Sequence, residues 1–176
     1  MNINERSEKT KRLAICAMLS ALGVVLLYIG SLVEVLDISM AAIASLFVIF
    51  AVIEYGAAAW AIYAVTGILS AILLPNKLPA AMYLLFLGFY PIIKEKIEKI
   101  NKKALQWGIK IAVFNLCLIV LIFLTNVVLA LEFSKIFVFE AVFMLLANFT
   151  FVIYDIALTR LISLYLFRLR RKFRIK

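Results

Sequence analysis

The chain has 176 residues, of which 66% are hydrophobic and 16% are charged, and its formal net charge at neutral pH is +9. Soluble domains are about 45–50% apolar and about 25% charged, so a soluble fold of this length is excluded and most of the chain should lie in lipid. The sequence has no histidine, which removes the commonest general base and zinc ligand, and it has no GxxxxGK loop for nucleotide phosphates. Cys16 and Cys117 lie within apolar runs and outside any paired motif, so we expect buried thiols and no disulfide.

Six apolar segments follow one another along the chain, each near the roughly 20 residues that a helix needs to cross the hydrocarbon. They comprise residues 13–33, 38–53, 57–74, 78–93, 105–131 and 136–167, of which the second and the fourth look short. The first is too long for a signal peptide and lacks a clear cleavage site, so we expect a permanent span. The sequence predicts an all-α membrane protein, a six-transmembrane-helix bundle that forms one integral membrane domain over residues 1–176.

The distribution of cations predicts the topology of these spans. Seventeen of the 19 lysine and arginine residues fall on one side, in the N-terminal arm, the loop 94–103 and the C-terminal tail, and at Lys110 and Arg160. Only Lys77 and Lys135 fall on the other side. Because positively charged loops stay in the cytoplasm, both termini are predicted to be cytoplasmic. The same charge indicates contact with anionic lipids rather than with nucleic acid.

Small residues line one face of the first span. Ala14, Ala17 and Ala21 recur at spacings of three and four, which places them on one side of a helix. Small side chains in lipid let two helix backbones approach closely, so this face marks a helix contact. The partner is either another protein or a helix of the same chain, because the third span is also rich in alanine and glycine. Spacing alone leaves both alternatives open.

A group of polar and aromatic residues is predicted to converge in the outer half of the bundle. Pro75 and Pro79 bracket the second outer link and should make it rigid, because each proline stops a helix. Amide, carboxylate, ammonium and aromatic groups together suit a small polar ligand. The candidate ligand-binding residues are Asn76, Lys77, Tyr83, Asn126, Glu140, Met144 and Asn148.

Structural roles are the alternative for each polar member of this group. Asn126 and Asn148 can form hydrogen bonds between helices, each worth about 0.6 kcal/mol. Glu140 can lie at the interface, and Lys77 can lie in an exposed turn. Both interpretations stay open from the sequence alone.

A second polar group lies in the inner half of the bundle. Asp155 and Arg160, with Lys110 near them, are predicted to pair and to hold helices together. Glu140 is too distant to act with Asp155 as a catalytic dyad, since 15 helical residues separate the two by about 22 Å. We therefore expect no enzyme, no catalytic residue, no metal site and no cofactor.

The chain resembles the S components of energy-coupling factor (ECF) transporters, which are small membrane subunits that capture vitamins. The resemblance rests on the layout of six spans with both termini inside, on the size of the chain, and on a basic arm that leads into an alanine-rich first helix. Family members carry an Ala-x-x-x-Ala motif in that helix, and Ala17 to Ala21 match it here.

The resemblance implies a function for both predicted surfaces. The alanine face would dock on the transmembrane coupling subunit, which two cytoplasmic ATPases energise, and the outer residues would bind a vitamin or similar micronutrient. Capture would be followed by toppling of the subunit in a bacterial or archaeal plasma membrane. The alternative is a non-transport scaffold similar to the cell-shape protein MreD, which needs a partner-binding face but no ligand site.

Overall fold

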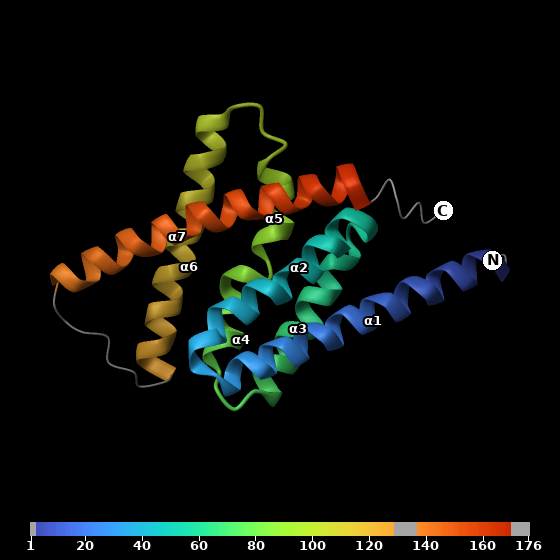
Figure 1. Ribbon diagram of the computed structural model, residues 1–176, viewed down its shortest axis with the longest axis horizontal. Helices are drawn as coiled ribbons and strands as arrows, with labels where there is room; N and C mark the ends of the chain where they lie inside the picture. Colours follow the sequence, from blue (N-terminus) through green and yellow to red (C-terminus); the bar gives the residue numbers. More distant parts are fainter. Residues whose placement is uncertain (1–2, 129–136, 170–176) are drawn as a thin grey trace.

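The computed structural model describes residues 3–128 and 137–169, with side chains described for 7–33, 35–124 and 142–167 (Figure 1). Helices make up nearly all of the described chain, and no strand occurs in these ranges. The elements in order are α1 (Ile3–Leu32), the 3₁₀ turn η1 (Glu34–Leu36), α2 (Asp37–Tyr55), α3 (Ala58–Leu73), α4 (Leu78–Met82), the π-helical turn η2 (Tyr83–Leu87), α5 (Tyr90–Ile97), α6 (Lys103–Val128), α7 (Phe137–Leu164) and the π-helical turn η3 (Tyr165–Leu169).

The helical, apolar character predicted from the sequence is confirmed. With α4, η2 and α5 taken as one segment, the described chain forms six helical segments, and five of them are long and apolar enough to cross a membrane. The helix Asp37–Tyr55 and the segment Leu78–Ile97 have 19 and 20 residues, so the second and fourth segments are longer than the sequence suggested. The short segment is instead the third, because α3 has only 16 residues.

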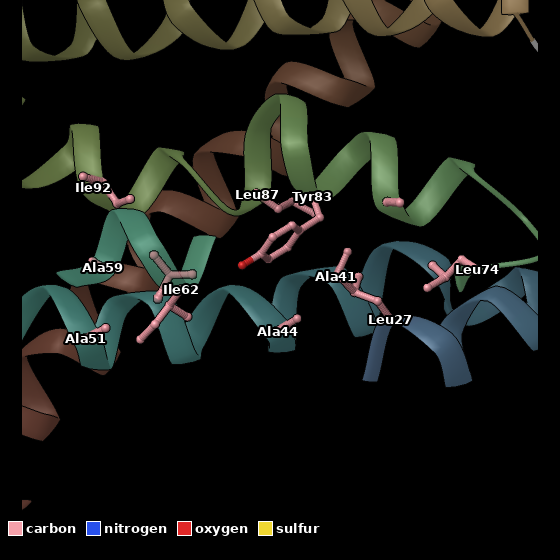
Figure 2. Close-up of a cluster of buried hydrophobic side chains, with 12 residues drawn as sticks. Leu27, Ala41, Ala44, Ala51, Ala59, Ile62, Leu74, Tyr83, Leu87 and Ile92 are labelled. Atoms are coloured by element: carbon pink, nitrogen blue, oxygen red, sulfur yellow. The ribbon is translucent and has the colours of Figure 1, made fainter. Parts of the chain in front are cut away.

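The main core lies where α1, α2, α3 and the fourth segment meet. Its buried members come from one face of each helix, as the residues of α2 show with Ala41, Ala44, Val48 and Ala51 at spacings of three and four. Figure 2 shows this cluster, with the ring of Tyr83 projecting from the fourth segment toward the helices that face it. Small side chains on α2 leave room for that ring, so the fourth segment lies close to α2.

Glycine allows α1 to approach α3 closely. A Cβ atom placed on Gly23 would lie 2.9 Å from Cγ2 of Thr66, closer than real Cβ contacts allow. The Thr66 hydroxyl donates a 3.4 Å hydrogen bond to the backbone carbonyl of Ser20. The stiff β-branched Thr66 therefore occupies the space that any larger residue at Gly23 would need.

The fourth segment is not a regular helix. Its middle turn, η2, is a π-helix in which the N–H of Gly88 donates to the carbonyl of Tyr83 over 2.8 Å. Pro91 follows within the first turn of α5. Because proline lacks an N–H and its ring displaces the carbonyl one turn before it, the hydrogen-bond pattern must shift here.

The last helix packs on a second, aromatic cluster. Figure 1 shows α7 crossing α5 and α6. Phe151 of α7 is buried and stacks on Phe114 of α6, with ring centroids 4.6 Å apart and planes 7° apart. Phe86 and Tyr90 of the fourth segment complete the cluster, since both have ring contacts with Phe151. Aromatic packing thus joins the fourth segment, α6 and α7.

Candidate functional site

Asn76 lies in the predicted outer link and fastens it to α2. Its Nδ2 group donates a 3.2 Å hydrogen bond to Oδ2 of Asp37, a buried carboxylate at the first position of α2. Its Oδ1 atom accepts a 3.0 Å hydrogen bond from the backbone N–H of Leu78, where α4 begins. Asp37 was not among the predicted residues. The available signal was an acid at the start of an apolar run, where the positive end of the helix dipole stabilises it.

Lys77 caps the end of α3. Its Nζ atom donates to the carbonyl of Leu74 over 2.6 Å and to that of Ile72 over 3.2 Å, while the side chain stays exposed. The last carbonyls of a helix have no partner within the helix, and a cation near them also interacts favourably with the helix dipole. The structure thus gives Lys77 a local structural role and leaves its surface open to water or ligand.

Tyr83 belongs to the main core. Its side chain is fully buried, and Figure 2 shows it inside the cluster rather than in the outer link. Its ring lies 6.1 Å from the ring of Tyr63, between centroids. A Cβ atom placed on Gly88 would come within 2.8 Å of the Tyr83 ring, so the backbone also encloses it. A ligand would reach Tyr83 only through a rearrangement of this core.

Asn148 pairs with Asn115 across α6 and α7. Each amide nitrogen donates to the oxygen of the other amide over 3.0 Å. The Nδ2 group of Asn148 also donates to the carbonyl of Met144 over 2.9 Å, and Met144 is half-buried on the same helix. The side chains of Asn126 and Glu140 lie outside the described residues.

The described candidate residues have separate partners. Asn76 and Lys77 share the outer link and contact α2 and α3, whereas Asn148 is held by α6. Each hydrogen-bonded group is engaged within the protein, so ligand binding would have to displace or extend these bonds. Their role in a ligand site stays a prediction.

The alanine face of α1 is exposed. Ala14, Ala17 and Ala21 all lie on the surface, and the exposed face continues through Val25 and Tyr28 toward the end of the helix. No described helix of the chain covers these three alanines.

A different face of α1, with Ser20, Gly23 and Gly30 as its small residues, makes the internal contacts of this helix. Ser20, Gly23, Leu27 and Gly30 are buried against α2 and α3. They lie roughly a third of a turn around the helix from the alanines, at 100° per residue. The sequence reasoning did not single them out, although Gly23 and Gly30 are seven residues apart and therefore share a face.

A buried network of charges joins α5, α6 and α7. Asp155 of α7 accepts hydrogen bonds from Nζ of Lys94, from Nζ of Lys110 at 2.9 Å and from the hydroxyl of Tyr90 at 2.6 Å. The side chains of Lys94, Lys110 and Asp155 are 1%, 5% and 3% exposed. A carboxylate buried in this way needs paired cations, and two are present here.

Glu98 and Thr159 complete the network. The Oε1 atom of Glu98 accepts from Nζ of Lys94 at 2.7 Å and from Nζ of Lys110 at 3.1 Å. Lys94 also donates to the hydroxyl of Thr159 over 2.9 Å. Lys110 lies 5.4 Å from the ring centre of Trp107, a cation–π distance.

The predicted inner pairing is correct for Lys110 and wrong for Arg160. Arg160 is exposed, and the ion pairs of Asp155 are with Lys94 and Lys110. Five residues on a helix correspond to a rotation of about 140°, so Arg160 faces away from Asp155. Lys94 had been assigned only to the cytoplasmic charge of its loop.

Two more hydrogen bonds join α7 and the turn η3 that follows it to α2. The hydroxyls of Ser45 and Tyr154 lie 2.9 Å apart, and the hydroxyl of Tyr165 donates to Oε1 of Glu54 over 2.9 Å. The ends of α2 and α7 therefore meet on the same side of the bundle.

The polar groups described above form hydrogen bonds and ion pairs within the protein. Within the described part of the chain, no group of three or more His, Cys, Asp and Glu residues is arranged to hold a metal ion. Comparisons with protein-family models, with curated proteins and with solved structures found no match. The function is therefore inferred from the geometry and from the sequence pattern.

Proposed function

We propose that the protein is the substrate-binding membrane subunit of an ECF-type importer for a vitamin or similar micronutrient. The observation that carries the proposal is the exposure of Ala14, Ala17 and Ala21 on α1. A single helix has two small-residue faces, and the chain's own helices use only the other one. The exposed face then serves a helix of the coupling subunit, since small residues favour close helix contact in lipid.

The remaining parts of the proposal concern energy and the ligand. The chain has no nucleotide-binding loop, so ATP hydrolysis comes from two cytoplasmic ATPases that act through the coupling subunit. The ligand binds on the extracellular half, near the outer link with Asn76 and Lys77, and both termini are cytoplasmic. In a bundle of six consecutive spans, the second and the sixth end on the same side of the membrane. The hydrogen bond between Tyr165, directly after α7, and Glu54, near the end of α2, supports this topology of the spans.

The docking face can be tested with matched tryptophan variants. The tagged chain is co-expressed with a coupling subunit and its two ATPases, and the purified material is analysed for those subunits and for a bound small molecule by mass spectrometry. The double variant Ala17→Trp with Ala21→Trp should lose the three subunits and keep the small molecule. Leu22→Trp is the matched control, because Leu22 is exposed on a neighbouring face of α1 and should keep both.

The outcomes separate the proposal from its alternative. Retention of the subunits by the double variant would refute the docking role of this face. A wild-type chain that binds neither these subunits nor a small molecule would refute the importer function and favour a scaffold similar to MreD.

A further inference from the structure

The charge balance of the buried network depends on one group that is open to solvent. Lys94 and Lys110 bring two positive charges, and the buried Asp155 brings one negative charge. The balance is completed by Glu98, whose side chain is 37% exposed. An uncompensated buried charge is strongly unfavourable, so an anion at the place of the Glu98 carboxylate stabilises the two lysines.

The geometry at that place favours an oxygen that is shared by two cations. The ammonium groups of Lys94 and Lys110 both point to the same atom, Oε1 of Glu98, at 2.7 Å and 3.1 Å. Lysine binds phosphate as a point charge with three donors, and a phosphate oxygen can bridge two such groups. Hydrogen bonds also fix the positions of the two lysines, from Lys94 to the hydroxyl of Thr159 and from Lys110 to the carboxylate of Asp155.

Glu98 and the two lysines it contacts lie close to the ends of candidate membrane spans. Glu98 directly follows the candidate span Leu78–Ile97, and Lys110 lies about two turns into the candidate span Lys103–Leu124. Trp107, beside Lys110, is of the residue type that is enriched at membrane interfaces. The exposed lysines around this edge are Lys96, Lys99, Lys102 and Lys103.

We propose that Lys94 and Lys110 form a binding site for the phosphate group of an anionic lipid, and that the carboxylate of Glu98 occupies the site when no lipid is bound. The headgroup enters from the membrane edge, Glu98 turns out into water, and the charge balance is preserved. The exposed lysines attract the headgroup by long-range electrostatics, while the buried pair binds it. The site is independent of the outer ligand residues and of the alanine face.

Native mass spectrometry of the full chain in detergent tests the proposal. Phosphatidylglycerol and phosphatidylcholine are titrated separately, and the fraction of protein with retained lipid gives an apparent affinity. Glu98→Gln removes the competing carboxylate and should raise the affinity for phosphatidylglycerol about tenfold, the scale of one or two partly exposed ion pairs. Glu95→Gln is the matched control, because it removes the same charge one turn away and, among the described residues, the ion pair of Glu95 is with exposed Lys99.

Three results would overturn the proposal: no difference between the Glu98→Gln and Glu95→Gln variants, an equal gain for phosphatidylcholine, or a fall in affinity. Inorganic phosphate is added as a competitor. Displacement of the lipid at millimolar phosphate would support the site and assign it to soluble phosphate, whereas resistance would assign it to the lipid headgroup.

A second measurement keeps the test valid if Glu98→Gln does not fold. Phosphatidylglycerol should raise the melting temperature of the wild-type protein in detergent more than phosphatidylcholine does. Lys110→Gln should abolish that difference, because one bridging ammonium group is lost. Equal stabilisation of the wild-type protein by both lipids would refute the site.

Discussion

The two faces of α1 can be distinguished by placing leucine on each. Gly23→Leu inserts a side chain where even a Cβ atom would lie 2.9 Å from Thr66. Overpacking of a closely packed contact lowers the free energy of unfolding by up to about 3 kcal/mol. Replacing glycine with leucine in a helix raises it by about 1 kcal/mol, because leucine has the higher helix propensity. The expected net loss is therefore about 2 kcal/mol, or about 4–8 °C in melting temperature for a chain of this size. Ala21→Leu, two residues away on the exposed face, should change stability by less than about 0.5 kcal/mol.

Thermal unfolding of both variants in the same detergent measures this difference. Intrinsic tryptophan fluorescence is a suitable probe because both tryptophans lie outside α1. An Ala21→Leu variant that lost as much stability as Gly23→Leu would refute the assignment of the two faces of α1, since the alanine face would then be an internal contact. A neutral Gly23→Leu would show that α1 and α3 are not closely packed at this point.

Two further predictions concern the interior contacts of α7. Asp155→Asn leaves Lys94 and Lys110 without their buried anion and should lower the free energy of unfolding by about 3 kcal/mol. Arg160→Gln on the same helix is the control and should be nearly neutral. Equal melting temperatures for the two variants would contradict the buried network. For the amide pair of α6 and α7, Asn148→Leu alone or Asn115→Leu alone should destabilise the protein. The double variant should be less destabilised than the sum of the two single variants, by about 0.6 kcal/mol. A double-mutant cycle of unfolding free energies measures that coupling, and strict additivity would show that the pair does not form.

Hydropathy was sufficient to predict the helical segments, because the apolar runs are long and the breaks between them are polar or contain proline. The predicted segments 38–53 and 57–74 coincide closely with α2 and α3. The irregular fourth segment was not predicted, since a π-helical turn such as Tyr83–Leu87 reflects packing around Tyr83 and the presence of Pro91 rather than a distinct hydrophobic period.

The polar contacts were predicted less well, because partners on different helices are not related by sequence spacing. A buried Asp155 requires a cation, and Arg160 was predicted as its partner because it is the nearest cation in the sequence. Arg160 instead lies on another face of α7 and is exposed. Of the two actual partners of Asp155, Lys110 was named and lies 45 residues away, whereas Lys94 was missed and lies 61 residues away. The signal for it was present, since Lys94 follows an apolar run and lies one turn after Tyr90, which contacts the same carboxylate.

The small residues of α1 were recognised as a face but only in part. Alanines at spacings of three and four are easy to see, whereas the internal face combines serine, glycine and leucine and has no simple motif. The exposure of a residue depends on where the other helices pack, and the sequence of one helix does not contain that information.

The shortness of α3 has a consequence for the surrounding bilayer. Its 16 residues extend over about 24 Å, whereas the apolar part of α1, residues 13–32, extends over about 30 Å. A hydrocarbon layer about 30 Å thick matches α1 but not α3, so the hydrophobic mismatch at α3 is relieved by thinning of the lipid beside it. Thinning draws headgroups and water inward at the end of α3, where Lys77 lies, so that Asn76 in the adjoining link is reached from water across less than the full depth of the leaflet.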